Sequence, residues 1–211
     1  MSLPRSKGIL FVISGPSGVG KTSIIRAVLE RVEHLVFSVS CTTRPQRPGE
    51  VDGIDYFFVS TEKFQQMISE NAFLEWAVVH DNYYGTPASF VLENLEKGLD
   101  VILDIDVQGA LRVKASYPGA KFVFIAPPSF ETLRERLRRR GTESDERIAR
   151  RLENAKRELK HIPEFEYLLI NEDLETSISN LISIIHAERL KFERLKDLEI
   201  VRNLYGGDHD G

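Results

Sequence analysis

The stretch that decides the fold runs from Gly8 to Thr22 and reads "GILFVISGPSGVGKT". Its first part, residues 8–14, is a continuous apolar run, which is typical of a strand covered on both faces of a sheet. The rest fits the pattern Gly-x-x-x-x-Gly-Lys-Ser/Thr at every defined position. Glycines let backbone N–H groups converge on an anion, and a helix N-terminus adds the positive end of its dipole. This order of strand, loop and helix therefore predicts a nucleotide-phosphate site.

Two side chains of this phosphate loop, residues 15–22, have expected roles. Lys21 would contact the β and γ phosphates of a bound nucleotide, and the Thr22 hydroxyl would join the shell of a Mg²⁺ ion. The alternative is a glycine-rich turn that only caps a helix, but the position directly after an apolar strand favours the phosphate site. The expected nucleotide-binding residues of the loop are Gly15, Pro16, Ser17, Gly18, Val19, Gly20, Lys21 and Thr22.

A second apolar run, "VILDID" at residues 101–106, carries two carboxylates, Asp104 and Asp106. Apolar strands rarely bury carboxylates that lack a partner. We therefore expect at least one of the two to serve the metal or the substrate, with Asp104 reaching Mg²⁺ through water. The alternative is that one of them only caps the helix that follows.

Short apolar runs alternate with helical patterns along the chain. Strands are expected at 8–14, 101–106, 121–127 and 166–172, and helices at 21–33, 107–116, 129–160 and 175–197. This alternation predicts an α/β fold whose core is a parallel sheet with helices on both faces.

Two segments break this alternation. Residues 37–96 carry shorter strands, at 36–41 and 54–60, with a helix near 61–70, and they predict a small inserted mixed α/β lobe. Residues 133–158 hold nine arginines and are interrupted at Gly141, which suits a hinged helical lid. The expected division is core at 5–36, 97–130 and 161–205, inserted lobe at 37–96, lid at 131–160 and tail at 206–211.

Composition limits the classes of partner. The chain has 211 residues, a net charge of −4 and one cysteine, so it has no basic surplus for nucleic acid and no internal disulfide. The apolar run at 9–13 is too short for a signal peptide or a membrane span. We expect a cytoplasmic protein without nucleic-acid or membrane partners. Because the helix at 175–197 could pack internally or against a second copy, a homo-oligomer stays open.

The phosphate loop alone does not name a reaction, and three classes compete. A GTPase switch would use the Asp-x-x-Gly pattern at 106–109, but the Asn-Lys-x-Asp element of such proteins is absent from the sequence. A binding module could keep the fold without the chemistry. A small-molecule kinase is favoured by "SVSCTTRPQRPGEVDGIDYFF" at 38–58, because Arg44 and Arg47 are planar cations suited to a phosphate dianion. Tyr56, with Tyr83 or Tyr84, could donate to the same oxygens.

Four stretches together resemble guanylate kinases: "SVSCTTRPQRPGEVDGIDYFF", "FLEWAVVHDNYYGT" at 73–86, "VILDIDVQGA" at 101–110 and "RRRGTESDERIARRL" at 138–152. With the phosphate loop, the resemblance covers residues from about 8 to about 175. It implies that ATP and GMP, with dGMP as a further acceptor, are the small-molecule substrates, and that ADP and GDP are the products of GMP phosphorylation. It also implies a core, a GMP-binding lobe and an arginine-bearing lid that close on one another.

The resemblance also assigns individual residues. The side chains implied on the GMP phosphate are Arg44, Arg47, Tyr56 and Tyr84. Those implied to face the guanine are Ser40, Glu75, Thr86 and Asp106; the family often has serine where Thr86 stands, which keeps the hydroxyl. The catalytic set implied by the resemblance is Lys21, Arg44 and the lid residues Arg136, Arg140 and Arg151. Asn171 is implied to lie near the adenine.

The chemistry of these residue types agrees with that assignment. Guanine presents N–H donors at N1 and N2, from which Glu75 could accept, and an O6 acceptor for the hydroxyls of Ser40 and Thr86. The accepting phosphate is already anionic near neutral pH, so positioning and charge neutralisation replace a general base. Two alternatives stay open: a non-catalytic guanylate-kinase-like module that binds phosphoproteins, and a kinase of another nucleoside monophosphate. An intact phosphate loop argues against the module.

Overall fold

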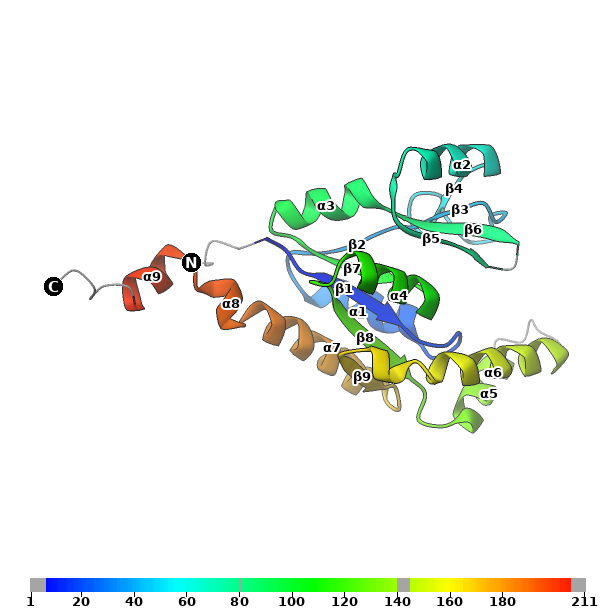
Figure 1. The fold of residues 1–211 in the computed structure, drawn as a ribbon. Helices are drawn as coiled ribbons and strands as arrows, with labels where there is room; N and C mark the ends of the chain where they lie inside the picture. Colours follow the sequence, from blue (N-terminus) through cyan, green and yellow to red (C-terminus); the bar gives the residue numbers. More distant parts are fainter. Residues whose placement is uncertain (1–6, 80, 140–144, 206–211) are drawn as a thin grey trace.

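The computed structural model describes residues 7–79, 81–139 and 145–205. A five-stranded sheet, in which every pair is parallel, runs through the middle of the molecule (Figure 1). Across the sheet the strands are β2 Leu35–Phe37, β7 Asp100–Asp104, β1 Leu10–Ser14, β8 Lys121–Ala126 and β9 Tyr167–Ile170. The prediction of an α/β fold with a parallel core sheet is confirmed.

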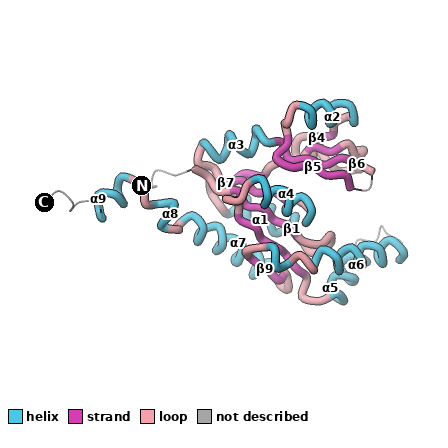
Figure 2. The backbone as a smooth tube through the Cα atoms, in the orientation of Figure 1, coloured by secondary structure: helices cyan, strands magenta, loops and turns pink. Residues whose placement is uncertain are grey.

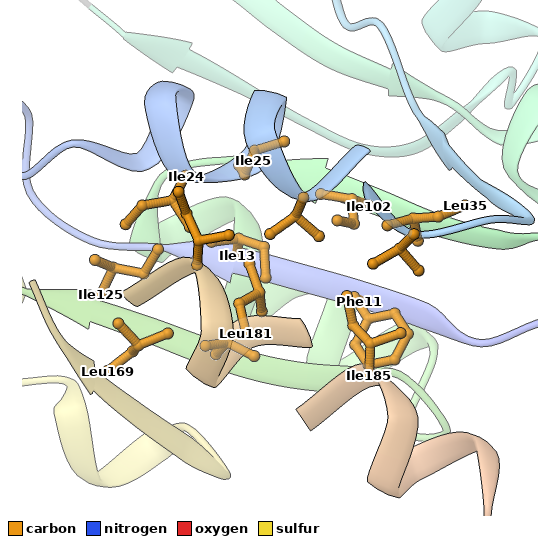
Figure 3. Close-up of a cluster of buried hydrophobic side chains, with 14 of the residues drawn as sticks. Phe11, Ile13, Ile24, Ile25, Leu35, Ile102, Ile125, Leu169, Leu181 and Ile185 are labelled. Carbon is orange, nitrogen blue, oxygen red and sulfur yellow. The ribbon is translucent and has the colours of Figure 1, made fainter. Parts of the chain in front are cut away.

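Alternation along β1 divides its side chains between two layers of helices. Phe11 and Ile13 pack with α1 Lys21–Arg31 and α7 Leu174–Arg189, in the apolar cluster that Figure 3 shows. Leu10 and Val12 lie in the opposite cluster, with α3 Ala88–Glu96 and α4 Val107–Ser116. Because both faces are covered, every residue of β1 is buried, which explains its uninterrupted apolar sequence.

A second sheet lies beside the core, with the order β4-β3-β6-β5. Its strands are β3 Cys41–Thr42, β4 Phe57–Phe58, β5 Phe73–Val79 and β6 Asn82–Pro87. Helix α2 Thr61–Ser69 covers it, and the Phe64 ring of α2 stacks on Phe73 with centroids 4.4 Å apart. Gly85 lies beneath these two rings, where a Cβ atom would come within 2.9 Å of both. Figure 2 shows this sheet separated from the core sheet, with α3 leading back to the core.

Helices α5 Phe130–Arg139 and α6 Asp145–Leu159 lie on the side of the core sheet away from the second sheet, near β8 and β9 (Figure 1). They share a small apolar cluster of their own, built on Leu133, Leu137 and Ile148. A 3₁₀ turn, η1 Ile162–Glu164, leads from α6 into β9. Helices α8 Phe192–Leu195 and α9 Glu199–Tyr205 follow α7, and α9 extends away from the sheets. The expected interruption at Gly141 falls outside the described residues.

Two expected strands are wrong in their extent. The strand expected at 36–41 is divided, because the Ser38 N–H still donates to Ile102 O of the core sheet, at 3.0 Å, whereas Cys41 pairs with Gly85 in the second sheet. The chain therefore crosses between sheets at this point. The strand expected at 54–60 is reduced to β4, because the turn at 51–56 uses the preceding backbone groups, such as Asp55 N–H to Val51 O at 2.9 Å.

Two helices also differ from expectation. The helix expected at 175–197 ends at Arg189, where the Leu190 N–H is shared between two carbonyls and Lys191 has the non-helical angles φ −59° and ψ 131°. Helix α3 was not predicted. Its signals are Pro87 at the N-cap, Gly98 after its end and the buried pair Val91 and Leu95, which are four residues apart.

Within the part of the chain that the structure describes, every helix is too short or too polar to span a membrane.

The core cluster predicts a large contrast between two leucines. Leu181 is 0% exposed in the cluster of Figure 3, and Leu204 on α9 is 81% exposed. Leu181→Ala should lower the free energy of unfolding by about 2–5 kcal/mol, because it removes buried methyl groups and leaves a cavity. Leu204→Ala, the matched control, should change it by less than about 0.5 kcal/mol. Urea unfolding followed by far-UV circular dichroism measures both. Equal losses would contradict this account of the core.

Candidate active site

A cavity of about 340 Å³ lies at the carboxyl ends of β1 and β7, where it is also lined by the second sheet. Ligand sites of open parallel sheets commonly occupy this edge. Its walls come from the phosphate loop, the second sheet and the loops next to its strands, the segment that joins β7 to α4, and the end of α6. The expected site residues that line it are Gly15, Pro16, Ser17, Gly18, Gly20, Lys21, Thr22, Ser40, Tyr56, Glu75, Tyr84, Asp104 and Asp106.

The phosphate loop depends on glycine at positions where another residue would be strained. Gly15 and Gly20 have φ angles of 143° and 104°, in the range that L side chains rarely adopt. A Cβ atom on Gly15 would also lie 2.1 Å from Ile125 O of β8. Gly20 is the N-cap of α1, so the loop leads directly into the positive end of that helix dipole.

Sheet register brings the loop lysine beside a carboxylate. Ile13 of β1 pairs with Asp104 of β7, so the ends of the two strands lie next to each other. Lys21 Nζ donates to Gly15 O at 2.5 Å and lies 3.9 Å from Asp104 Oδ1. Burial raises the pKa of the Asp104 carboxyl, and the charge of Lys21 opposes that rise. Thr22 lines the same cavity, so its hydroxyl and the Asp104 carboxylate both present oxygen atoms to it.

The second sheet places a buried carboxylate on the opposite wall. Glu75 of β5 is 7% exposed and pairs with Thr86 of β6, which is fully buried. Thr86 Oγ1 donates to Glu75 Oε1 at 2.9 Å. Burial raises the pKa of Glu75 to about 7; the Thr86 hydrogen bond opposes that rise, and the negative charge of Asp106 adds to it. Glu75 is thus an enclosed acceptor rather than a solvated charge.

The loop that follows β3 and carries Arg44 and Arg47 is called the arginine loop here. It is organised by an acid, Glu50, that was not expected from the sequence. Arg44 forms a two-pronged ion pair with Glu50, at 2.8 and 3.1 Å, and its guanidinium lies 5.4 Å from the centre of the Tyr56 ring. Glu50 also accepts from the Arg47 backbone N–H at 2.8 Å. The side chain of Arg47 is exposed. An acid at the end of a basic, proline-containing segment was the signal for this role of Glu50.

A further cavity of about 560 Å³ adjoins the first. The two share Thr22, Ser40, Tyr56 and Asp104 as lining residues, and the further cavity extends between α1 and residues 50–56. The hollow between the core and the second sheet therefore continues from the phosphate loop to the arginine loop.

Two arginines of α5 and α6 reach the phosphate loop. Arg136 donates to Val19 O at 3.2 Å and to Asn171 O at 2.8 Å. Arg151 donates to Ser17 Oγ at 3.2 Å. Both helices therefore contact the loop through positive charge. The third expected arginine of this segment, Arg140, lies outside the described residues.

Several expected site residues have protein partners. Asn171 donates to Val19 O at 2.7 Å and accepts from Ser177 Oγ at 2.9 Å, so its buried amide braces the phosphate loop. Asp106 caps α4 by accepting from the Gly109 N–H at 2.7 Å, while it also lines the cavity. The expected residues that the structure describes outside the cavity lining are Val19, Arg44, Arg47, Thr86, Arg136, Arg151 and Asn171.

Glu158 of α6 lines the cavity and was missed by the sequence analysis. Its Oε2 atom is buried, and among the described residues no hydrogen-bond partner contacts that atom. Burial raises the pKa of this carboxyl, and the positive charge of Lys21 opposes that rise. A signal existed: Glu158 stands beside the apolar positions Ala155 and Leu159 of the helix, where an acid is unexpected.

Comparisons with known proteins agree with this geometry. The sequence model of the guanylate kinase family matches residues 7–188. The guanylate kinase of Caldanaerobacter subterraneus is 52% identical over 92% of this chain and 94% of its own, and that of Thermotoga maritima is 54% identical over 90% and 92%. The crystal structure of guanylate kinase from Anaplasma phagocytophilum superposes with a TM-score of 0.79 at 34% identity, covering 94% of this chain and 95% of that one. The chain belongs to the guanylate kinase family.

Proposed function

We propose that this chain transfers the γ-phosphoryl group of ATP to GMP, giving ADP and GDP. The observation that carries the proposal is one cavity lined by Lys21 and Thr22 of the phosphate loop and by Glu75, a buried carboxylate suited to guanine. Membership of the guanylate kinase family supports the same reaction. The roles proposed for single residues in binding Mg²⁺, guanine and phosphate rest on the geometry of this cavity and its surroundings.

On the donor side, the residues present fit a Mg²⁺ ion that is shared with phosphates. The cavity offers the Thr22 hydroxyl and the Asp104 carboxylate, both oxygen ligands of the kind that Mg²⁺ prefers. Among the described residues no cluster of three or more acidic, histidine or cysteine side chains could hold a metal alone. Mg²⁺ in kinases needs few protein ligands, because phosphates and water supply the rest. Thr22 would bind it directly and Asp104 through water, and the bound ion would neutralise charge on the β and γ phosphates.

On the acceptor side, Glu75 would accept hydrogen bonds from N1 and N2 of guanine, which adenine cannot supply. Thr86 orients that carboxylate through its 2.9 Å hydrogen bond, so its own donation to O6 would require the hydroxyl to turn. Ser40 and Asp106, which line the same cavity, would complete the contacts to the base. A 2′-deoxy sugar would leave all of these contacts in place, so dGMP is a further acceptor.

The phosphate of GMP would lie between the two tyrosines and the arginine loop. Tyr56 and Tyr84 line the cavity, and their ring centroids are 6.0 Å apart. Arg44 is paired with Glu50 in the structure, and a phosphate dianion would compete for the same guanidinium fork. Arg47, whose side chain is exposed, would approach the phosphate from the loop surface.

In the transfer step, an oxygen of the GMP phosphate forms a bond to the γ-phosphorus, while the bond from that phosphorus to the bridging oxygen of ADP breaks. Positioning and cation charge carry the reaction. We assign that charge to Lys21, Arg44, Arg136 and Arg151, together with Arg140. The lobe at 37–96 and the lid at 131–160 would close over the substrates and exclude water, which disfavours hydrolysis of ATP.

The acceptor profile tests the proposed function. With Mg-ATP, ADP release should be fast with GMP, slower with dGMP and at background with AMP, UMP or no acceptor. Lys21→Ala should lower kcat with GMP by about 10²–10³-fold while the far-UV circular dichroism is unchanged, since one preorganised charge at the phosphates is removed. Lys97→Ala, whose side chain is 66% exposed, is the control. If the wild-type chain used AMP or UMP in place of GMP, it would be another nucleoside monophosphate kinase. If it turned over no acceptor at all, it would be a binding module.

The guanine contact predicts a selective effect of Glu75→Gln. The change replaces one acceptor oxygen by an NH₂ group, so the KM for GMP should rise by about 10–100-fold. The KM for ATP should change by less than about twofold, because ATP would bind at the phosphate loop. Steady-state kinetics with each substrate varied in turn measures the two constants, and Glu93→Gln, on an exposed side chain, is the control. A similar rise in the KM for GMP and the KM for ATP would mean that Glu75 does not contact the guanine base.

The raised pKa of Glu75 predicts a pH dependence with a definite sign. Only the ionised carboxylate accepts from both guanine donors, and with a pKa of about 7 it is mostly protonated at pH 6. Between pH 8 and pH 6, kcat/KM for GMP should therefore fall by about tenfold. In the Glu75→Gln enzyme the Glu75 carboxyl is absent, so any remaining change of kcat/KM with pH reports the titration of GMP itself. An identical pH profile in both enzymes would refute the assignment.

A further inference from the structure

Gly109 occupies an unusual place in the first turn of α4. It is buried, it lines the cavity, and helix α4 packs against β5, the strand that carries Glu75. A Cβ atom at Gly109 would lie 2.9 Å from Glu75 Oε2 and 3.3 Å from Glu75 Cδ. The missing side chain therefore leaves the space that the Glu75 carboxylate fills.

Backbone geometry does not explain a glycine here. The φ angle of Gly109 lies outside the positive range that other glycines of this chain adopt, so any residue could take this conformation. Glycine inside a helix lowers helix stability relative to alanine, because it has more freedom to lose on folding. The remaining physical reason is the space beside Glu75.

The Glu75 carboxylate has little freedom to move away from an added methyl group. Its other oxygen, Oε1, is held by Thr86 Oγ1 at 2.9 Å, and the residue is 7% exposed. Ordinary Cβ contacts begin at 3.4 Å, so Oε2 would have to move by about 0.5 Å. Only the end of one side chain would shift, which the fold can tolerate, but that end is the group proposed to read guanine.

Gly109 also contacts the second acid of this wall. Its backbone N–H donates to Asp106 Oδ1 at 2.7 Å. Any residue except proline could donate the same N–H group to Asp106. The effect that is specific to glycine is therefore the space left for the Glu75 carboxylate, and both acids line the cavity.

We propose that Gly109 is a positioning residue for the guanine base: its lack of a side chain leaves the Glu75 carboxylate in the place from which it would accept the N–H groups of guanine, and it thereby contributes to the preference for GMP. The inference rests on the proposed function, because it concerns how the same site recognises its acceptor. It predicts an effect on GMP binding that is independent of ATP and of the transfer step.

The test compares identical substitutions at Gly109, in the first turn of α4, and at Gly119, in the turn that follows the end of α4 at Ser116. Gly109→Ala should raise the Kd for GMP, measured by isothermal titration calorimetry without ATP, by about tenfold or more, because sub-ångström misplacement of contacts is costly. The KM for GMP should rise in parallel, with the KM for ATP within about twofold of wild type. Gly119→Ala is the matched control, since among the described residues a Cβ atom there would meet only Tyr117 Cε1, at 3.9 Å, and it should leave all three constants unchanged. The Tm of Gly109→Ala should not fall.

Rescue by a shorter acid distinguishes positioning from general damage. Glu75→Asp withdraws the carboxylate, so it should weaken GMP binding strongly in the wild-type chain and much less in the Gly109→Ala chain. Such non-additivity between two substitutions reports their contact. Additive effects would overturn the proposal. If Gly109→Ala alone fails to fold, folding of the double variant would support the contact with Glu75, and failure of both would overturn it.

The failure of this inference can be told apart from failure of the proposed function. A wild-type Kd for GMP in Gly109→Ala, together with impaired binding in Glu75→Gln, would overturn the role of Gly109 and leave the role of Glu75 intact. No binding of GMP to the wild-type chain would overturn both.

Discussion

The parallel pairing of β1 with β7 and β8 is the constraint on which the whole site depends. It places Asp104 level with Ile13, at the point where the chain leaves the sheet, and it brings Ile125 O against the position where Gly15 has no side chain. The phosphate loop is therefore shaped by the sheet beneath it as well as by its own glycines. Burial of both faces of β1 stabilises this arrangement, because the strand that carries the loop lies in the centre of two apolar clusters.

The second feature that organises the site is the pairing of charges before any substrate is bound. Lys21 lies near Asp104, Arg44 is paired with Glu50, and Arg136 and Arg151 contact oxygens of the phosphate loop. A concentration of cations in one cleft would otherwise repel itself. In the proposed function, substrate phosphates would compete with these protein partners for the same cations. Glu158, which faces the same cavity with a buried oxygen, adds a further acid to this balance.

The two substrates require opposite properties of the two walls. In the proposed function, the loop side would present N–H groups and cations to phosphates, whereas the second sheet would present the buried Glu75 carboxylate to the N–H groups of a base. Thr86 holds one oxygen of the Glu75 carboxylate by a hydrogen bond, and the absence of a side chain at Gly109 leaves room for the other oxygen. Recognition by a buried acceptor is selective, because a base that lacks matching donors leaves that acceptor unsatisfied. The second sheet is small, and the stacked rings of Phe64 and Phe73 over Gly85 pack helix α2 onto it.

The sequence by itself determined the fold class, the phosphate loop and the residue types of the site, since periodic apolar runs and glycine spacing are local signals that survive in any context. It also indicated Glu75 and Asp104, because a carboxylate beside apolar residues is costly without a purpose. Only the tertiary structure decided the division of residues 36–41 between two sheets, the end of α7 at Arg189, the bracing role of Asn171, and the approach of Glu50, Glu158 and Gly109 to the site. These depend on which segments lie side by side. Contacts between residues far apart in the chain, such as Gly109 and Glu75, follow from sheet register and helix packing, which no local pattern encodes.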